Sequence, residues 1–303
     1  MKVFYHNDND GKCSAALVYR HYNVDPPDVA SEIPIGFNKM DYGMRFTLED
    51  ISKDERVYIL DYSIEVNEMK ELLNITSNVV WCDHHKTAIE KYDDFLNGLV
   101  RNQQIIEGGR NINYAGCELT WFHFHKNDPI PEFVKYIADR DLWKWKYGDL
   151  TKHFNDGLIL RNTTPSSEIW NDKYVDAVIQ EGDVVSRAKL VLSLEQLEER
   201  GFWITFHGYN CFAINSDIIR GSEYLEMSEP DADIWMVFKL NRSALNPNLF
   251  NELYFTVSLY TKKPEIDVSK IAMNYMFKGK IGGGHKGASG FQSKGLDFLF
   301  DHI

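Results

Sequence analysis

The chain has 303 residues, of which 44% are hydrophobic and 26% are charged, and its formal net charge is −12. This composition is typical of globular proteins, and the length allows two domains with hydrophobic cores. The acidic balance argues against a protein that holds long duplex DNA on its surface, because such a surface needs a basic stripe. A small anionic substrate remains compatible, because bound divalent cations reverse the local charge of an acidic site.

The cysteines and the apolar runs indicate the cellular compartment in which the protein is expected. Cys13, Cys82, Cys117 and Cys211 are scattered without a CxxC pair, which favours a reducing environment over a disulfide framework or a zinc ribbon. The N-terminus shows no apolar signal-peptide region, and no apolar run approaches the roughly 20 residues that span a bilayer. We therefore expect a cytoplasmic protein that does not act at a membrane.

The first half of the chain alternates predicted strands and helices. Strands are predicted at residues 3–5, 57–60 and 79–81, and apolar residues at helical spacing follow the first two, at residues 15–19 and 66–73. Two further helices are predicted at residues 116–126 and 132–139. This alternation predicts a mostly parallel sheet with helices on its faces.

The second half of the chain has a different pattern of predicted helices and strands. A long helix is predicted at residues 174–200, broken near Gly182 and ending at Gly201. Beyond it come β-rich runs at 202–206, 211–214, 234–238 and 254–259, then a helix at 268–276. We therefore predict an α/β chain with an N-terminal mostly parallel-sheet domain at 1–175, a helical connector at 176–200 and a smaller α+β domain at 201–303.

Acid and histidine side chains recur where the predicted strands and helices end. They are His6, Asp8 and Asp10, then Asp61, then Asp83, His84 and His85, and finally Asp139. Taken singly, each has an ordinary explanation as a turn residue, a helix cap or an ion-pair partner. Together they fall where the carboxyl edge of one sheet would gather them, which is where open α/β sheets bind ligands. Carboxylate and imidazole suit Mn²⁺, Zn²⁺ or Fe²⁺ better than Ca²⁺.

These motifs resemble those of the DHH phosphoesterase family. The chain carries His6-x-Asp8-x-Asp10-Gly11, Leu60-Asp61, the triplet Asp83-His84-His85 and Ala138-Asp139. Its C-terminal part contains Gly282-Gly283-Gly284-His285, which is similar to the GGGH signature of the associated substrate-binding domain. The single residue between His6 and Asp8 is closer to RecJ-like exonucleases than to typical nanoRNases. The resemblance spans nearly the whole chain.

The resemblance implies a centre of two divalent metal ions, usually Mn²⁺, with Mg²⁺ or Co²⁺ as alternatives. It implies that His6 and Asp8 hold one ion, that Asp10, His84 and Asp139 hold the other, and that Asp61 bridges them. Asp141 is the rival of Asp139, because both are acids in one short segment. Two catalytic roles follow: Asp83 orients a ligand, and His85 faces the substrate phosphate.

The glycine cluster has two interpretations. It is either a tight turn, since glycine tolerates positive φ, or a cradle whose backbone N–H groups bind phosphate. The resemblance favours substrate binding by Gly282, Gly283, Gly284 and His285. The Arg-Ser pair of many relatives is absent, so Tyr260 is expected to stack on a base and Lys262, or its neighbour Lys263, to supply charge.

The predicted function is a metal-dependent phosphodiesterase that hydrolyses short oligonucleotides or dinucleotides to mononucleotides through two-metal activation of water. The runner-up is an exopolyphosphatase or nucleoside bisphosphate phosphatase, and the non-enzymatic alternative is a nucleotide-sensing protein on a degenerate DHH fold. The expected partner is a short oligonucleotide or dinucleotide rather than long duplex DNA. A homodimer stays open.

Overall fold

The chain forms two compact units. The computed structural model describes residues 1–24, 33–41, 44–101, 105–126, 128–219, 221–242 and 253–300. The first unit is Met1–Ser186 and the second is Arg187–Ile303. Within the described ranges, no helix is long and apolar enough to cross a membrane. The division at 175 and 200 into a metal-binding part, a connector and a substrate-binding part stays a prediction.

The first unit is built on a four-stranded parallel sheet in the order β2-β1-β3-β4. Its strands are β1 (Lys2–His6), β2 (Gly36–Met40), β3 (Val57–Leu60) and β4 (Val79–Cys82). Its α-helices are α1 (Asn9–Asn23), α2 (Val66–Ile75), α3 (Lys86–Arg101), α4 (Gly116–His125), α5 (Glu132–Asp141) and α6 (Asp149–Gly157), with short 3-10 turns at Leu158–Leu160 and Asp172–Tyr174. The predicted parallel sheet is confirmed, whereas β2 was not predicted.

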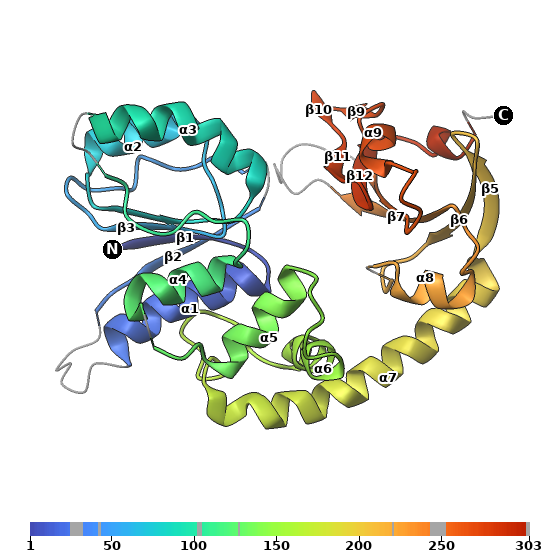
Figure 1. Cartoon of the computed structure of the whole chain (residues 1–303), viewed down its shortest axis with the longest axis horizontal. Coiled ribbons are helices and arrows are strands. Elements are labelled where there is room, and N and C mark those ends of the chain that lie inside the picture. The colour runs from blue at the N-terminus through green and yellow to red at the C-terminus, as the bar shows by residue number, and fades with distance from the viewer. Residues whose placement is uncertain are drawn as a thin grey trace. The chain divides into compact units, whose positions relative to one another are not determined.

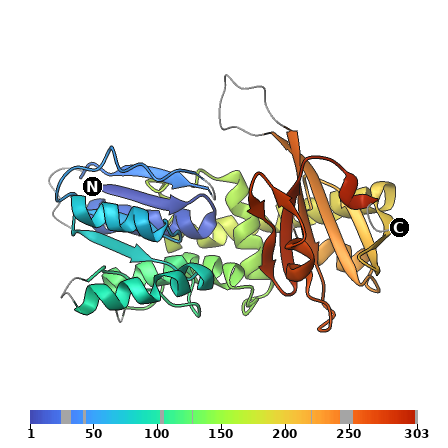
Figure 2. The same cartoon turned by 90° about the horizontal axis from the view of Figure 1, so that it is seen from above.

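The alternation of side chains along each strand decides which helices cover which face (Figure 1). Phe4, Ile59 and Trp81 point to the face that α2 and α3 cover, where they form one buried cluster. Their neighbours along the strands, such as Tyr58 and Val80, pack under α1 and α4 on the opposite face. Both faces are therefore buried, which is why these strands are almost entirely apolar. Figure 2 views the same sheet from the side of α2 and α3.

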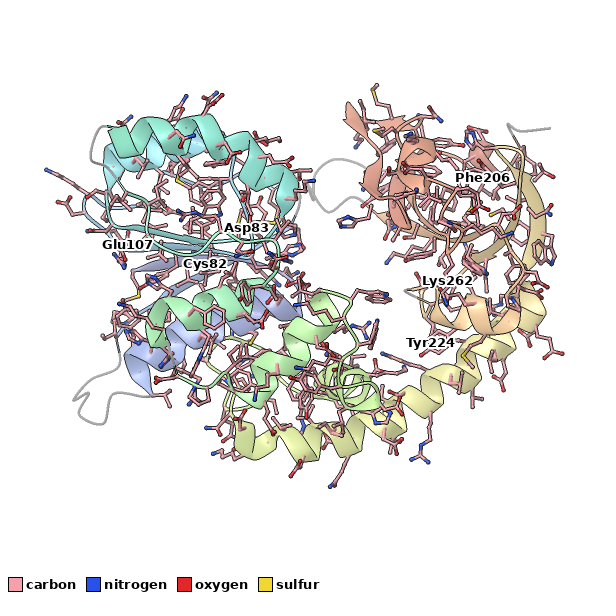
Figure 3. The ribbon with its side chains drawn as sticks, viewed as in Figure 1. Cys82, Asp83, Glu107, Phe206, Tyr224 and Lys262 are labelled. Carbon is pink, nitrogen blue, oxygen red and sulfur yellow. The ribbon has the colours of Figure 1, made fainter. Side chains whose placement is uncertain are left out.

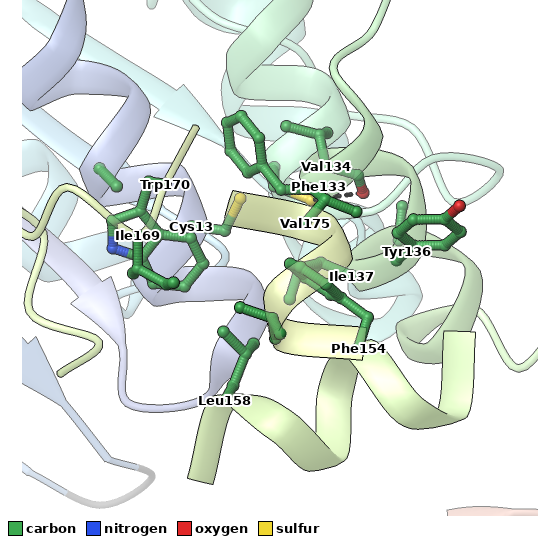
Figure 4. Packing of buried hydrophobic residues seen from close by; sticks show 14 of the residues in the cluster. Cys13, Phe133, Val134, Tyr136, Ile137, Phe154, Leu158, Ile169, Trp170 and Val175 are labelled. Atoms are coloured by element: carbon green, nitrogen blue, oxygen red, sulfur yellow. Dashed lines mark hydrogen bonds between the residues drawn. The ribbon is translucent and has the colours of Figure 1, made fainter. Parts of the chain in front are cut away.

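A second core of the first unit lies among α1, α4, α5, α6 and the start of the long helix α7 (Val175–Arg200). Trp170, Phe154 and Phe133 are among its buried side chains (Figure 4). The predicted break near Gly182 is wrong, since α7 continues through it. A Cβ at Gly182 would lie 1.7 Å from the carbonyl oxygen of His153, so this glycine allows α7 to pack directly on α6.

The second unit contains a six-stranded mixed sheet in the order β11-β12-β8-β7-β6-β5. Its strands are β5 (Phe202–Phe206), β6 (Tyr209–Asn215), β7 (Ile234–Arg242), β8 (Leu253–Tyr260), β11 (Gly283–His285) and β12 (Ala288–Ser293), with a separate pair β9 (Met276–Phe277) and β10 (Lys280–Ile281). One face packs against α9 (Val268–Ala272) and the 3-10 turn Asp297–Leu299, and the other against α8 (Glu223–Ser228) and the end of α7. The α+β class predicted here is confirmed.

One helix of the second unit is shorter than the sequence predicts. The prediction extended it from Val268 to Met276, whereas α9 ends at Ala272 and Met276 already belongs to β9. The ring of Tyr275 stacks on Phe291 of β12, with centroids 3.8 Å apart. This contact with the sheet takes Tyr275 out of the helical path, which periodicity alone does not reveal.

Candidate metal centre

The carboxyl ends of three neighbouring strands gather the acid and histidine side chains of the first unit. His6 is the last residue of β1, and Asp61 and Asp83 directly follow β3 and β4. From the adjacent strands β1 and β3, α1 and α2 leave on opposite faces of the sheet (Figure 1). The order of the sheet therefore reverses between β1 and β3, which is where such sheets bind ligands.

The first group of side chains joins the end of β1 to the end of its neighbour β3. His6 Nδ1 lies 2.7 Å from an oxygen of Asp8 and 3.6 Å from an oxygen of Asp61. The other oxygen of Asp8 accepts a hydrogen bond from Gly11 N at 2.9 Å, so Asp8 also caps α1. The ordinary and the functional interpretations of Asp8 are thus compatible, because its two oxygens serve different partners.

The second group is centred on His84. Its Nε2 lies 3.1 Å from Asp61, 3.3 Å from Asp141 and 3.8 Å from Asp10. Asp10 in turn accepts hydrogen bonds of 2.7 Å from the backbone N–H groups of Gly116 and Cys117, in the first turn of α4. The N-terminus of α4 therefore holds the carboxylate in place. Burial, together with the nearby charge of Asp61, raises the pKa of Asp10 to about 8.

Asp61 lies between the two groups and is the most constrained of these residues. It is 1% exposed and adopts a φ of 50°, a left-handed conformation that non-glycine residues rarely take. Its N–H donates to the carbonyl of Cys82 at 2.8 Å, which ties the turn to β4. Within the described residues, neither carboxylate oxygen of Asp61 forms a hydrogen bond. Burial raises its pKa well above the usual value.

The geometry of these side chains fits divalent cations. Three sets of ligand atoms lie within 4.8 Å of one another: His6, Asp8 and Asp61; Asp10, His84 and Asp141; and Asp61, His84 and His85. Buried carboxylate oxygens without hydrogen bonds are costly, and a bound cation would satisfy those of Asp61. Nitrogen and oxygen donors together suit Mn²⁺, Zn²⁺ or Fe²⁺.

Of the two rival acids at the end of α5, Asp141 is the one that approaches His84. The carboxylate of Asp139 instead accepts hydrogen bonds from Lys146 N at 2.8 Å, Tyr147 N at 3.2 Å and Thr151 Oγ1 at 2.5 Å. The Asp139 side chain is 4% exposed, and these three partners lie in the loop after α5 and in α6. We therefore propose Asp141, rather than Asp139, as the ligand from the fourth motif.

Asp83 and His85 form a separate pair beside these groups. Asp83 is fully buried, and one of its oxygens accepts from the backbone N–H groups of His84 and His85 at 2.7 and 3.2 Å, and lies 2.7 Å from His85 Nδ1. Ser63 donates to the other oxygen. Burial alone would lower the pKa of His85, but the hydrogen bond and charge of Asp83 raise it to about 9. Asp83 thus orients the imidazole of His85. Figure 3 labels Asp83 at the end of β4.

Two glycines allow the elements to approach this closely. A Cβ at Gly116 would lie 2.6 Å from the Cβ of Asp61 and 3.0 Å from an oxygen of Asp10. A Cβ at Gly11 would lie 2.1 Å from the carbonyl oxygen of His6. Neither glycine was predicted to have a role at the site. A glycine at the first position of a predicted helix, as Gly116 is, was the available signal.

The glycine cluster lines a pocket of the second unit with a volume of about 510 Å³. Of the predicted substrate-binding residues, Tyr260 and Gly282, Gly283 and Gly284 line it, whereas His285 and Lys262 do not. Gly284 has a φ of 144°, and a Cβ there would lie 2.7 Å from the Cα of Ser289. Part of the cluster is therefore required by the close contact between β11 and β12.

The lysines predicted to supply charge near this pocket are paired with acids. Lys262 forms a salt bridge with Glu226, and Lys263 forms one with Asp233 (Figure 3 labels Lys262). The backbone N–H of Lys263 also donates to Thr261 Oγ1 at 3.1 Å, just beyond the end of β8. The salt bridges reduce the charge that Lys262 and Lys263 offer to a substrate phosphate.

The sequence match to a known protein covers about half of the chain. No family model matches the chain. An uncharacterized protein of Acanthamoeba polyphaga mimivirus, R106, is 29% identical over 151 residues, which are 48% of this chain and 34% of that protein. The match thus spans about one third of the length of that relative.

Solved structures give a broader likeness. The DHH domain of a protein described as a member of a family of ribosomal proteins superposes with a TM-score of 0.58 at 12% identity, covering 99% of this chain and 84% of that one. RecJ from Thermus thermophilus in complex with Mn²⁺ superposes with a TM-score of 0.45 at 13% identity, covering 96% of this chain and 49% of that one. The first of these shows that the chain has the fold of a DHH-domain protein.

Proposed function

We propose that the chain is a DHH-type phosphoesterase, and specifically a metal-dependent phosphodiesterase that hydrolyses short oligonucleotides or dinucleotides to mononucleotides. One observation carries the proposal. The buried carboxylate of Asp61 lies within 3.6 Å of His6 and within 3.1 Å of His84, and each histidine belongs to its own group of potential ligands. A single carboxylate shared by two ligand groups is suited to holding two cations close together, as in two-metal sites.

The proposed ligand set is His6 and Asp8 for one ion and Asp10, His84 and Asp141 for the other, with Asp61 shared. When bound, two divalent cations, which we expect to be Mn²⁺, would neutralise phosphate charge and make water a stronger nucleophile. The Asp83 carboxylate holds the His85 ring in place through Nδ1. We assign His85 the role of donating a hydrogen bond or proton to the phosphate or the departing oxygen.

Short substrates follow from the charge of the chain. Affinity for a long polyanion grows with the number of basic contacts, and this chain has a net charge of −12. The salt bridges of Lys262 and Lys263 reduce the basic surface of the second unit further. We therefore expect the best kcat/KM on substrates of about two to five nucleotides, with a shallow dependence on salt.

The test combines binding with turnover. The protein would be stripped with a chelator, reloaded with Mn²⁺, Mg²⁺ or Co²⁺, and incubated with a dinucleotide, a pentanucleotide, a long single strand and polyphosphate. We expect mononucleotide products, fastest from the first two substrates. Cation binding at about 100 times Kd should also stabilise the fold by about 2.7 kcal/mol, which corresponds to a rise in Tm of roughly 5–10 °C.

The controls separate the alternatives. Asp10→Asn removes a carboxylate ligand from the second group, so it should reduce the rise in Tm and abolish the products. Phosphate release from polyphosphate without dinucleotide cleavage would favour the exopolyphosphatase. A protein that binds no cation and shows no turnover would contradict the proposal and favour a nucleotide-sensing role. Degradation of long strands with a steep salt dependence would contradict the assigned substrate length.

A further inference from the structure

The loop at residues 142–148, which connects α5 to α6, has an unusual composition and backbone. It reads Leu-Trp-Lys-Trp-Lys-Tyr-Gly, so aromatic and basic side chains alternate. Trp143 and Trp145 both have positive φ angles, 54° and 52°. A bulky aromatic residue rarely adopts this conformation, and two such residues in one loop indicate that the fold imposes a specific geometry here. We call this segment the tryptophan loop.

Asp139 holds the tryptophan loop in place. Its carboxylate accepts from the N–H groups of Lys146 and Tyr147, and its carbonyl oxygen accepts from Lys144 N at 2.9 Å. The side chain of Lys144 donates to the carbonyl of Asn113 at 3.1 Å. A buried carboxylate therefore organises this loop, which explains why the strained backbone persists.

The loop presents an indole to solvent. Trp143 is 55% exposed, and its ring lies 5.0 Å from that of Trp145 at an angle of 77°. The edge of one ring therefore supports the other and limits its freedom. A large ring that packs on a second indole and stays exposed adds little to the core, which favours a role in binding.

Three cations belong to the tryptophan loop or directly precede it. The guanidinium of Arg140 lies 5.6 Å from the ring of Trp145, and Lys144 and Lys146 alternate with the tryptophans. Within the described part of the chain, none of these three cations forms a salt bridge with a carboxylate. They contrast with Lys262 and Lys263, which do. The loop is thus a local concentration of positive charge and aromatic surface on an acidic protein.

The tryptophan loop begins at the proposed metal centre. Asp141, the residue that lies 3.3 Å from His84 Nε2, precedes Trp143 by two positions. A nucleotide whose phosphate lies at the centre would have its base within a few ångströms of its own phosphate group. Because the loop starts one residue after Asp141, it begins within reach of such a base.

The geometry points to a base-stacking site: the exposed face of Trp143, supported by Trp145, stacks on a nucleobase of the single-stranded substrate, and Lys144, Lys146 and Arg140 attract the adjoining phosphate. Stacking on an aromatic ring tolerates every base, since each base has a π-face. This inference rests on the proposed function and adds to it a site that selects nucleotides over other phosphate esters.

The test compares a substrate that has bases with one that lacks them. For the Mn²⁺-loaded protein, KM would be measured for a 5′-phosphorylated diadenylate and for the same dimer with abasic sugars. We expect the wild-type protein to have a KM for the diadenylate about tenfold lower, and W143A to remove this difference. W203A is the matched control, because Trp203 is 49% exposed on β5 of the second unit.

A binding experiment makes the inference independent of turnover. Adenosine monophosphate should quench tryptophan fluorescence in the chelator-treated wild-type protein and in W203A, but much less in W143A. Thermal unfolding and metal content would confirm that W143A is folded and loaded. If W143A raised the KM of both substrates equally, or if quenching persisted in W143A, the stacking site would be overturned. If the wild-type protein cleaved neither substrate, the proposed function would fail, while loss of quenching in W143A would still support the base site.

Discussion

The carboxylate of Asp61 lies 3.1 Å from Nε2 of His84, although the two residues follow different strands of the sheet. The same carboxylate approaches His6 at 3.6 Å, so it connects all three strand ends. Asp61 has a left-handed backbone, and both of its buried carboxylate oxygens lack a hydrogen bond among the described residues. A structural role alone does not explain these features.

Asp61→Asn should reduce metal content and lower activity by about 100-fold or more, since changes to residues that only support ligands already cost about 10–100-fold. Asparagine tolerates positive φ, so the substitution removes the charge without adding backbone strain. Asp54→Asn is the matched control, because Asp54 also has a positive φ and is exposed. Metal would be measured by mass spectrometry. Full occupancy in Asp61→Asn would show that Asp61 is not shared between the ions.

Asp139→Asn should lower the stability of the fold, whereas Asp141→Asn should lower its metal content. The amide introduced at position 139 would place a donor against groups that already donate, which should cost about 1–3 kcal/mol and lower Tm by about 2–4 °C for each kcal/mol. Asp141→Asn should keep the Tm of the metal-free protein and lose one ion. Calorimetry and metal analysis of both variants decide between them. A stable, metal-poor Asp139→Asn would return the ligand role to Asp139.

His85→Ala should keep both metal ions and lower turnover by about 10²–10⁴-fold, the usual contribution of a proton-transferring group. Its ring is held by Asp83 through Nδ1, which favours a role toward the substrate. His85 also belongs to the group with Asp61 and His84, so metal content must be measured together with kcat. Loss of an ion in His85→Ala would make His85 a ligand instead.

His123 should make the fold sensitive to acid. Burial lowers the pKa of His123, and the neighbouring charges of Arg56 and His21 lower it further, against the charge of Glu107. The unfolded chain therefore binds a proton more readily, so stability present above the usual pKa of about 6.5 is lost as the pH falls through and below it. Between about pH 7.5 and about pH 5.5, which bracket that pKa, His123→Gln should lose less stability than the wild-type protein. Equal losses in urea unfolding would contradict this role.

The sequence by itself predicted three of the four strands of the sheet and the strand ends that carry the site. Apolar runs such as Val57–Leu60 are unambiguous, because a parallel strand buried on both faces must be apolar throughout. The residues after such strands necessarily meet at one edge, which places His6, Asp61 and Asp83 together once the strands are parallel. The motifs and their spacing also predicted the kind of chemistry, whereas the substrate is a proposal.

Only the tertiary structure decided between residues that lie close in sequence. Asp139 and Asp141 are two positions apart on one helix, so their side chains point about 200° apart, and packing determines which of them faces His84. Tertiary packing also explains Gly182 and Gly116. A side chain at either position would collide with another element of the fold. The tryptophan loop depends on backbone angles and on the buried Asp139 carboxylate. Local patterns carry no record of these contacts, because they arise between segments far apart in the chain.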